Sequence, residues 1–274
     1  MTPYGINRKT VVITGASGGF GSELCKILIN EHGCRVIGIG RSREKFEELS
    51  QSLGDRKNKF RYVLFDVSVR ENWQRFAKKL EKKDIIPDLL INNAGIMPPF
   101  EKFEDEDGET AKSVMDVNFM SVVYGCEAMI PLLLRSAEGG IVNVASSAAF
   151  SPVVGIAIYS ASKGAVKNFT QSLCEEMRGR LYIGCVFPGF SETGLFRDSR
   201  LTEEDLSFIG GLGTDKAEIA AAIVRGIANG RKLIVCGKDS QMMTALSSVA
   251  PSSANALYTK VLTESGLEMF RRLK

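Results

Sequence analysis

Short apolar runs alternate with longer amphipathic segments along most of this chain of 274 residues. The runs are rich in β-branched residues and show little polar alternation, which is typical of strands buried on both faces. Helical patterns separate most of them, for example at residues 22–33, 69–83 and 165–179. Because parallel strands need crossovers, this order predicts an α/β fold: a doubly wound, seven-stranded parallel sheet with helices on both faces. The predicted strands are residues 10–14, 34–40, 60–65, 88–91, 140–146, 181–187 and 232–236.

The chain is 44% hydrophobic, which is enough to bury a full core, and it contains no repeat or linker that would divide it. The sequence therefore predicts one domain over residues 1–237, including a substrate lid at 189–215. Residues 238–274 follow the last predicted strand and are expected to form a helical C-terminal extension.

Charge and cysteine usage exclude several classes of function. The formal net charge of +3 comes from 35 basic and 32 acidic residues spread along the chain, so no nucleic-acid partner is expected. The six cysteines are scattered through apolar segments, which favours a reducing compartment and no metal site. No signal-like core and no apolar stretch of roughly 20 residues occurs, so we expect a cytoplasmic protein.

A glycine-rich turn, TGASGGFG at residues 14–21, stands between the first predicted strand and a predicted helix. At this place in a doubly wound sheet, a turn that binds a dinucleotide must be tight. It must also let a pyrophosphate approach backbone N–H groups, and it must let the helix pack close to the strand. Gly15, Gly18, Gly19 and Gly21 can meet these three needs. The alternative is an ordinary structural turn.

Five motifs together resemble the classical short-chain dehydrogenases/reductases. They are TGASGGFG at residues 14–21, NNAG at 92–95, a serine at 146, YSASK at 159–163 and PGFSET at 188–193. The resemblance covers roughly residues 8–237 and implies a Rossmann fold and an oxidoreductase. Because residues 18 and 19 are both glycine, the loop also fits the extended branch of this family. Extended members carry a C-terminal substrate domain, and the length of this chain favours the classical branch.

Tyr159 and Lys163 are four residues apart on a predicted helix, so their side chains share one face. An adjacent ammonium favours a phenolate, so Lys163 is predicted to lower the pKa of Tyr159, the acid–base group. The resemblance implies that Ser146 bonds the substrate oxygen, with Ser147 as the competing candidate. It also implies that Asn118 helps hold a water in a proton relay with Lys163. The alternatives are a surface tyrosine–lysine pair and an ordinary helix-interior asparagine.

The resemblance further implies where an NADP(H) cofactor binds. Asp66 matches the residue that bonds the adenine amino group, and residues 92–95 border the adenosine side. Pro188, Gly189 and Thr193 match residues beside the nicotinamide ring, with Thr193 as a partner of the carboxamide. The predicted cofactor-binding residues are Gly15, Ser17, Gly18, Gly19, Phe20, Gly21, Arg41, Ser42, Asp66, Val67, Asn93, Ala94, Gly95, Tyr159, Lys163, Pro188, Gly189 and Thr193.

The end of the second predicted strand decides the choice between NADP and NAD. An NAD-selective site has an acid there to bind the ribose hydroxyls, whereas this chain reads GIGRSREKF. Arg41, helped by Ser42 and Arg43, is predicted to bind a 2′-phosphate through charge-assisted hydrogen bonds. A solvated arginine at a helix start is the alternative. Many NADP-dependent relatives also carry a basic residue in the glycine loop, where this chain has Gly18.

The segment 189–215 is long and amphipathic, and its glycines Gly210, Gly211 and Gly213 are candidate hinges of a lid. Apolar residues in three segments predict a pocket wall for a hydrophobic ketone or secondary alcohol that is steroid-, bile-acid- or acyl-like. Packing of the lid onto the domain is the alternative. The candidate wall residues are Met97, Pro98, Pro99, Phe100, Val153, Val154, Ile156, Leu195, Phe196, Leu201, Leu206 and Phe208.

The last predicted strand is followed by VCGKDSQ and then by nearly forty further residues. Their helical periodicity predicts an amphipathic extension that packs on its own domain or across a dimer, with a membrane-surface contact as the alternative. A homodimer through the long central helices is expected. The apolar residues of the extension are Leu257, Val261, Leu262, Leu267 and Phe270.

Two functions from different classes fit this sequence. The first is an NADP(H)-dependent oxidoreductase that moves a hydride between nicotinamide and a ketone or secondary alcohol. The second is a catalytically silent nucleotide-binding regulatory protein on the same fold, which usually lacks the active-site tyrosine or lysine. Asn118, Ser146, Tyr159 and Lys163 are all present, so the sequence favours the enzyme.

Overall fold

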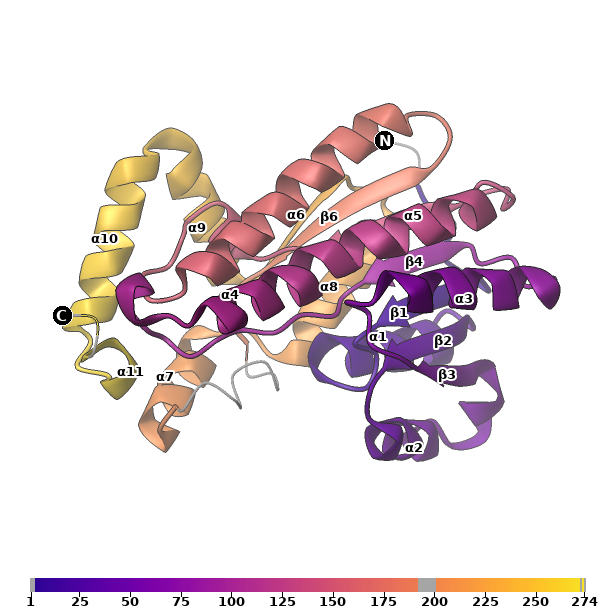
Figure 1. Cartoon of the computed structure of the whole chain (residues 1–274), viewed down its shortest axis with the longest axis horizontal. Helices are drawn as coiled ribbons and strands as arrows, with labels where there is room; N and C mark the ends of the chain where they lie inside the picture. Colours follow the sequence, from indigo (N-terminus) through magenta and orange to yellow (C-terminus); the bar gives the residue numbers. More distant parts are fainter. Residues whose placement is uncertain (1–2, 192–200, 272, 274) are drawn as a thin grey trace.

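A computed structural model describes residues 3–191, 201–271 and 273 of the chain. Its seven strands are all parallel and form one sheet in the order β3-β2-β1-β4-β5-β6-β7, which confirms the predicted Rossmann-like fold (Figure 1). The strands are β1 (Thr10–Thr14), β2 (Arg35–Gly40), β3 (Phe60–Leu64), β4 (Leu89–Asn92), β5 (Gly140–Val144), β6 (Tyr182–Pro188) and β7 (Leu233–Cys236).

Helices cover both faces of this sheet, and three more follow its last strand (Figure 1). A π-helical turn, η3 (Asp116–Met120), joins α4 to α5, and a short 3-10 turn, η4 (Ser147–Ala149), follows β5. The helices are α1 (Gly19–Asn30), α2 (Arg43–Ser52), α3 (Arg70–Lys82), α4 (Gly108–Met115), α5 (Ser121–Leu133), α6 (Ala157–Glu176), α7 (Glu203–Leu212), α8 (Lys216–Ala228), α9 (Lys238–Val249), α10 (Pro251–Glu264) and α11 (Glu268–Arg271).

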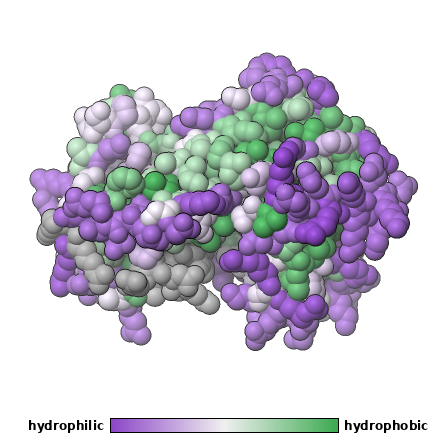
Figure 2. Space-filling view, in the orientation of Figure 1, coloured by the Kyte–Doolittle hydropathy of each residue, from purple (hydrophilic) through white to green (hydrophobic). Residues whose placement is uncertain are grey.

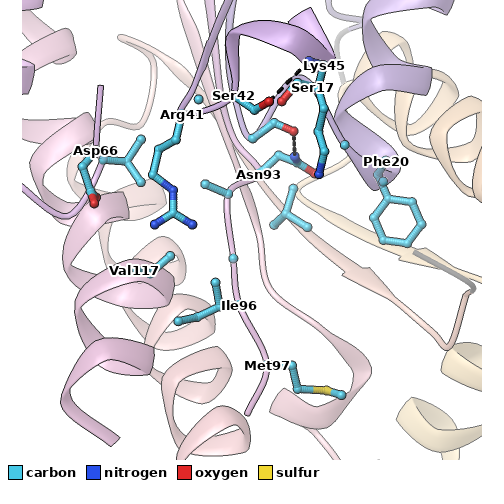
Figure 3. Close-up of a pocket in the computed structure, with 18 of the residues that line it drawn as sticks. Ser17, Phe20, Arg41, Ser42, Lys45, Asp66, Asn93, Ile96, Met97 and Val117 are labelled. Atoms are coloured by element: carbon cyan, nitrogen blue, oxygen red, sulfur yellow. Dashed lines mark hydrogen bonds between the residues drawn. The ribbon is translucent and has the colours of Figure 1, made fainter. Parts of the chain in front are cut away.

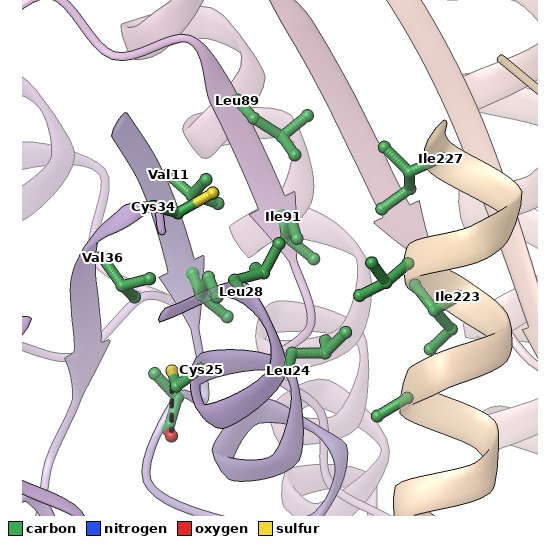
Figure 4. Close-up of a cluster of buried hydrophobic side chains, with 14 of the residues drawn as sticks. Val11, Leu24, Cys25, Leu28, Cys34, Val36, Leu89, Ile91, Ile223 and Ile227 are labelled. Carbon is green, nitrogen blue, oxygen red and sulfur yellow. Dashed lines mark hydrogen bonds between the residues drawn. The ribbon is translucent and has the colours of Figure 1, made fainter. Parts of the chain in front are cut away.

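Alternate residues of the central strand β1 build the two main cores. Val11 and Ile13 face one side, where they join Leu24 and Leu28 of α1 and the isoleucines of α8 (Figure 4). Val12 faces the other side, where it belongs to the core formed by α3, α5 and α6. The period of two places apolar residues on both faces, and each fully buried Leu or Ile side chain contributes about 1.5–3 kcal/mol.

One boundary that differs from the sequence prediction bears on the site. The strand expected over 140–146 ends at Val144, because Ser146 caps η4 by accepting a hydrogen bond from the Ala148 N–H at 3.2 Å. The helix predicted to carry Tyr159 and Lys163 is α6, which begins at Ala157. Ser146 and Tyr159 thus lie close together just beyond the end of β5.

The C-terminal helices α9, α10 and α11 pack at the end of the molecule where α4 and the start of α6 lie (Figure 1). Phe270 is 1% exposed, and its ring meets that of Phe100 edge-on at 5.2 Å. Leu257 and Val261, expected on the buried face of the extension, are instead about half exposed, at 53% and 54%. The reason is register: α10 turns residues 254, 258 and 262 inward, each one helical turn from the next.

In the described part of the chain, no helix is both long enough and apolar enough to cross a membrane. The same residues contain no group of three or more His, Cys, Asp or Glu side chains placed to hold a metal ion. Figure 2 shows apolar residues gathered over the outer side of α5 and α6, with hydrophilic residues around them.

Candidate active site

A cavity of about 430 Å³ lies at the carboxyl ends of strands β1 to β6 (Figure 3). Apart from the predicted cofactor-binding residues, its lining includes Lys45, Phe65, Ile96, Val117 and the predicted wall residue Met97. Ligands of open α/β sheets bind at this edge, where the helix N-termini also point. The predicted residues that line the cavity are Gly15, Ser17, Gly18, Gly19, Phe20, Arg41, Ser42, Asp66, Val67, Asn93, Ala94, Gly95, Tyr159, Lys163 and Pro188.

The four glycines of the loop have different structural roles. Gly15 and Gly19 have φ angles of +62° and +48°, which favour glycine. A Cβ on Gly21 would overlap the carbonyl oxygen of Gly15, so Gly21 allows the close packing of α1 on the turn. A Cβ on Gly18 would meet nothing within 4 Å. Gly21 therefore lies behind the cavity, whereas Gly15, Gly18 and Gly19 line it.

The glycine loop is held to the segment after β4 by hydrogen bonds that were not predicted from the sequence. The Thr14 hydroxyl accepts the backbone N–H groups of Asn93 and Ala94, both at 2.9 Å. The Asn93 amide donates to the Thr14 carbonyl oxygen at 2.9 Å. These bonds fix the two cavity-lining segments relative to one another, and their sequence signal is the threonine before the first glycine.

Basic side chains from the start of α2 reach the cavity at the end of β2. Figure 3 shows the Arg41 guanidinium pointing into the space between Asp66 and Val117. Ser42 caps α2 by accepting the Lys45 N–H at 3.3 Å, which places Lys45 one turn beyond Arg41. Lys45 was not among the predicted residues, although its spacing from Arg41 is that of neighbours on a helix. Arg43, by contrast, does not line the cavity.

Asp66 keeps its charge beside Arg41. Partial burial opposes ionisation of its carboxyl, but hydrogen bonds from Ser68 and the charge of Arg41 outweigh that effect and hold its pKa below the usual value. The Ser68 hydroxyl and N–H both donate to Oδ1, at 2.6 and 2.9 Å. The site therefore presents a cation and a carboxylate side by side at the end predicted for the adenosine.

Tyr159 and Lys163 lie at the opposite end of the cavity, 7% and 4% exposed. The Lys163 Nζ is 5.7 Å from the centre of the Tyr159 ring and donates to the Val144 carbonyl at 3.1 Å. Burial raises the pKa of Tyr159 to about 12, with a hydrogen bond to Ser146 acting in the opposite direction. Burial also lowers the pKa of Lys163 to about 8.

These pKa values differ from the sequence expectation, which had Lys163 lower the pKa of Tyr159. In this structure the loss of water around the phenol is the dominant effect, because desolvation disfavours the charged phenolate. The ammonium of Lys163 is instead bonded to a backbone carbonyl. Near neutral pH the Tyr159 hydroxyl is therefore protonated and able to donate.

The two candidate serines are placed differently. Ser146 is partly exposed, caps η4 and is hydrogen-bonded to Tyr159. Ser147 is 4% exposed and lies within η4 itself. The geometry favours Ser146, which was the preferred candidate, although neither serine lines the cofactor cavity itself.

Asn118 is fully buried in the π turn η3 and lies behind the cavity, in contact with the segment after β4. Its Oδ1 accepts the Ile96 N–H at 2.8 Å, and its Nδ2 donates to the Ile96 carbonyl at 2.9 Å and to the Ser162 hydroxyl at 3.1 Å. A Cβ on Gly95 would lie 3.3 Å from Asn118 Oδ1 and 3.4 Å from Lys163 Nζ. Asn118 thus positions the backbone that separates it from Lys163.

Around the nicotinamide end the predicted residues are only partly brought together. Pro188 lines the cavity, whereas Gly189 packs against the Asp239 carboxylate. Thr193 lies outside the described residues. Asp239 was not among the predicted residues; it lies in the stretch VCGKDSQ, at and just after the last strand.

A third apolar cluster stands beside Tyr159 and includes four residues of the predicted pocket wall: Met97, Phe100, Val153 and Ile156. Leu201 packs against it, but Pro98, Pro99 and Val154 are not part of it. Leu195 and Phe196 lie outside the described residues, as do the side chains of Leu206 and Phe208. Four apolar residues of the extension complete the cluster, although the sequence analysis did not assign them to this wall. They are Met243, Leu267, Met269 and Phe270.

Two glycines of the predicted hinge, Gly210 and Gly211, lie at the end of helix α7, and Gly213 follows it. Asp205 in the first turn of α7 is 1% exposed and accepts the Thr202 N–H and hydroxyl at 2.9 and 2.8 Å. It also accepts the Met269 N–H at 3.4 Å. Helix α7 and the C-terminal extension are therefore joined at a buried carboxylate.

Comparison with known proteins gives a family. Residues 9–204 match the family model described as short chain dehydrogenase. Among similar proteins is benzil reductase ((S)-benzoin forming) of Saccharomyces cerevisiae. It is 31% identical over 201 residues, which cover 71% of this chain and 76% of the yeast protein.

Two solved structures share the fold over almost the whole chain. A short chain dehydrogenase from Burkholderia cenocepacia in complex with NADP has a TM-score of 0.77 at 25% identity, covering 92% of this chain and 98% of that one. A short chain dehydrogenase/reductase from Burkholderia phymatum in complex with NAD has a TM-score of 0.79 at 23% identity, covering 94% and 97%. Together with the family match, the sheet order and the residues at its carboxyl edge, these findings establish that the chain belongs to the short-chain dehydrogenase/reductase family of oxidoreductases.

Proposed function

We propose that this protein is an NADP(H)-dependent reductase of ketones with apolar substituents, able to oxidise the corresponding secondary alcohols in reverse. The observation that carries the proposal is the arrangement of one cavity. Arg41 and Lys45 lie at one end, and Tyr159 and Lys163 lie at the other. A cation pair and an acid–base pair at the two ends suit a cofactor that carries a 2′-phosphate and a reactive ring.

The chemistry of the donor set fits a phosphorylated dinucleotide. The open N-terminus of α1 offers backbone N–H groups and a partial positive charge to a pyrophosphate. Asp66 offers a carboxylate oxygen to an amino group, and Arg41 and Lys45 offer charge-assisted hydrogen bonds to a 2′-phosphate. Lys45 supplies the second basic group that the glycine loop lacks at Gly18. When bound, the cofactor supplies the hydride and the residues below handle the proton.

Tyr159 is the proposed general acid for reduction. Its hydroxyl is protonated near neutral pH, so it can donate a proton to the oxygen of a carbonyl as negative charge develops there. In the oxidative direction the same oxygen receives the proton from an alcohol. A raised pKa favours the acid over the base, and this supports reduction as the faster direction at neutral pH.

Ser146 and Lys163 assist this proton transfer in different ways. The Ser146 hydroxyl is close enough to bond Tyr159, so it can also bond the substrate oxygen and fix its orientation. Lys163 lies against the Tyr159 ring with its Nζ held by the Val144 carbonyl, so its charge stands beside the phenol from which the proton leaves, although burial outweighs that charge in this structure. Asn118 holds the backbone of Ile96 beside both groups and acts as a positioning residue.

The apolar cluster beside Tyr159 supports a hydrophobic substrate. It combines Met97, Val153 and Ile156 of the domain with Met243 and Phe270 of the extension. The yeast relative is named for the reduction of benzil, a diketone with two aromatic rings. A ketone flanked by aromatic or aliphatic groups is the substrate class that we propose for this protein.

The test is a spectrophotometric assay of NADPH and NADH oxidation by the purified protein with benzil and a panel of aryl and alkyl ketones. We expect turnover with NADPH that is lost in Tyr159→Phe. Binding of NADPH without turnover of any ketone or alcohol would favour the silent nucleotide-binding protein. Faster turnover with NADH would overturn the assignment of Arg41 and Lys45.

We also propose that the protein forms a homodimer through α5 and α6. Figure 2 supports this with apolar residues over the outer side of these helices. Phe119 and Phe169 of this region are both partly exposed and pack edge-on at 6.1 Å. Sedimentation of the wild type as a dimer, and of Phe169→Glu as a monomer, is the expected result. A monomeric wild type would refute the proposal.

A further inference from the structure

A second cavity, of about 1000 Å³, lies at the other edge of the sheet, beside the amino ends of β1, β2 and β3. Among the described residues it shares no lining residue with the first cavity, which contains Tyr159. All of its lining residues are polar, charged or glycine, so an apolar molecule does not suit it. We call it the basic cavity, because four of its residues are cations: Arg8, Arg35, Arg56 and Lys59.

The sheet places cations from separate chain segments next to one another. Arg35 begins β2, and Lys59 directly precedes β3, which runs parallel to β2. In the register of this pair the two residues stand side by side, and neighbouring strands are about 5 Å apart. Arg8 also approaches Lys59, since a Cβ on Gly33 would lie 3.9 Å from Arg8 Cγ and 3.4 Å from Lys59 Nζ. The positive charges therefore share one space.

Two of the four basic side chains also support the structure. Arg56 donates to the carbonyl oxygen of Asn30 at the end of α1, and Lys59 Nζ donates to the Gly33 carbonyl at 3.2 Å. Both acceptors are neutral, and a guanidinium has five N–H donors and an ammonium three. Each side chain therefore keeps its charge and has further N–H groups to offer to a ligand.

Arg8 and Arg35 have no such structural role. Both are exposed, and neither side chain forms a hydrogen bond or an ion pair within the described part of the chain. The backbone of Arg8 has a φ of +58°, which glycine adopts without strain and arginine rarely adopts, so the turn does not explain an arginine there. Glu31 is the single carboxylate of the lining, and four cations against one anion leave an excess of three positive charges.

The kind of cation and the volume indicate the class of ligand. Three of the four cations are arginines, and guanidinium groups form paired, charge-assisted hydrogen bonds with phosphate oxygens. A volume of about 1000 Å³ is at the upper end of the range for small-molecule sites, so the cavity can hold more than one phosphate. A concave site also suits a small molecule better than the surface of a membrane.

We propose that the basic cavity binds a soluble small molecule that carries two or more phosphate groups. Arg8 and Arg35 supply its main contacts, and the other two cations add charge and further donors. This site is separate from the proposed cofactor site, and the inference goes beyond the proposed function. The two sites lie at opposite ends of α1, because Gly19 lines the first cavity and Asn30 lines the basic one.

The first experiment titrates tripolyphosphate into the protein by calorimetry, with NADP⁺ at saturation so that the first cavity is occupied. We expect one bound probe per chain. Arg8→Gly, which suits the backbone at that position, and Arg35→Ala should each weaken its binding at least about ten-fold, as the loss of a charge-assisted hydrogen bond allows. Arg61→Ala makes the same charge change on β3 outside the basic cavity, so the Kd should change less than about three-fold. Equal losses in all three variants would overturn the site, because only net charge would matter.

The second experiment compares probes at an ionic strength of about 0.15 M, where interactions between distant surface charges are screened. Tripolyphosphate should bind at least about ten-fold more tightly than orthophosphate, since it contacts more of the cations. Equal affinities would mean an adventitious ion only and would overturn the proposal. Tighter binding of an oligo-aspartate peptide, or of vesicles that contain phosphatidylglycerol, would also overturn it, because the surface would then recognise an acidic protein or a membrane.

A third measurement keeps this proposal separate from the proposed function. If NADP⁺ does not bind, the proposed function fails, and the tripolyphosphate titration is repeated without the cofactor. Weaker binding in Arg8→Gly with unchanged binding in Arg41→Asp supports the basic cavity by itself. The reverse result places the probe in the first cavity and overturns the second site.

Discussion

The half of the site that we propose for the cofactor and the half that we propose for the substrate are built in different ways; they are called the cofactor half and the substrate half below. The cofactor half uses backbone groups, glycines and residues within a few positions of a strand end, such as Gly15, Gly21 and Arg41. The substrate half is assembled from side chains of four separate segments, around Met97, Val153, Met243 and Phe270. The first half depends on local conformation, and the second depends on how a C-terminal extension docks.

This difference determines how each half responds to change. A strand-to-helix turn that closes around a phosphate tolerates few backbone alternatives, so its residues act through steric requirements. An apolar wall made by packing can exchange side chains of similar volume and keep its form. We therefore expect a substitution in the cofactor half either to disrupt cofactor binding or to leave it nearly unchanged. Substitutions in the substrate half should change KM by graded amounts.

The largest effect is expected at Tyr159, where the two halves meet. Tyr159→Phe removes only the acid hydroxyl, so kcat should fall about 10²–10⁴-fold, the range typical of general acid catalysis. The Kd for NADPH, measured by fluorescence titration, should stay within a few-fold of wild type. Ser146→Ala should also lose activity, and Ser147→Ala serves as its matched control. Wild-type turnover in Tyr159→Phe would mean that another group transfers the proton.

The next largest effect tests the steric requirement of the cofactor half. Gly21→Ala places a Cβ against the Gly15 carbonyl, so the turn must deform and NADPH affinity should fall at least about 100-fold. Gly18→Ala is the matched control, because a Cβ there meets nothing within 4 Å, and its affinity should change by only a few-fold. Equal losses of NADPH affinity in both variants would show that the loop requires the flexibility of glycine at each position and not the close packing at Gly21.

The cofactor preference comes third. Arg41→Asp removes a charge-assisted bond and adds repulsion, so the ratio of kcat/KM for NADPH to that for NADH should fall by roughly ten- to several-hundred-fold. Arg43→Asp makes the same charge change at a residue outside the cavity and should move the ratio far less. Comparable changes in both variants would reduce the role of Arg41 to long-range electrostatics.

The substrate half is tested by Phe270→Ala, which removes the ring that packs on Phe100. Truncation of a buried phenylalanine typically costs about 3–5 kcal/mol, so the melting temperature should fall. The KM for apolar ketones should rise several-fold, and the Kd for NADPH should remain near that of wild type. A parallel loss of cofactor affinity would show that the two halves are not separable.

The smallest effect concerns Lys163 and pH. Its pKa is about 8 in the folded protein and 10.5 without burial, so between these values the unfolded chain holds a proton that the folded chain has lost. This lysine therefore adds stability as pH rises from 8 to 10.5. The melting temperature of Lys163→Met relative to wild type should fall over the same interval, because the variant lacks that gain. The buried cysteine thiols have raised pKa values, so their contribution to stability decreases as the pH rises. Both proteins contain these thiols, and their contribution therefore cancels in the comparison. A constant difference would contradict the assignment.

The sequence predicted the seven-stranded parallel sheet and most of the residues that line the cavity, because both are carried by local patterns. Strand β1, the glycines after it and the residues 92–95 follow from apolar periodicity and from the family motifs. Lys45 was missed because its relevance depends on the direction of α2, and Thr14 was missed because its partners lie nearly eighty residues away. The pKa of Tyr159 was misjudged because burial is a property of the whole packed structure.

The substrate half was only partly predictable, for a physical reason. An amphipathic helix reveals that it has an apolar face, but not which part of the domain that face covers. Leu257 and Val261 matched the periodicity and are exposed, whereas Phe270 matched it and is buried. Met243 was not assigned to the apolar wall, since its place in the cluster depends on how α9 docks.

The π turn at residues 116–120 has a consequence for how sequences of this kind can change in length. It contains one residue more than an α-helical turn would, so α4 and α5 form a continuous rod with a single residue inserted. Deletion of one residue there would restore an even helix, but it would rotate one half by about 100° relative to the other. Asn118 would then leave Ile96, or the buried face of α5 would turn toward solvent. This segment therefore cannot lose a residue without disrupting these contacts, although it lies in the middle of a helix.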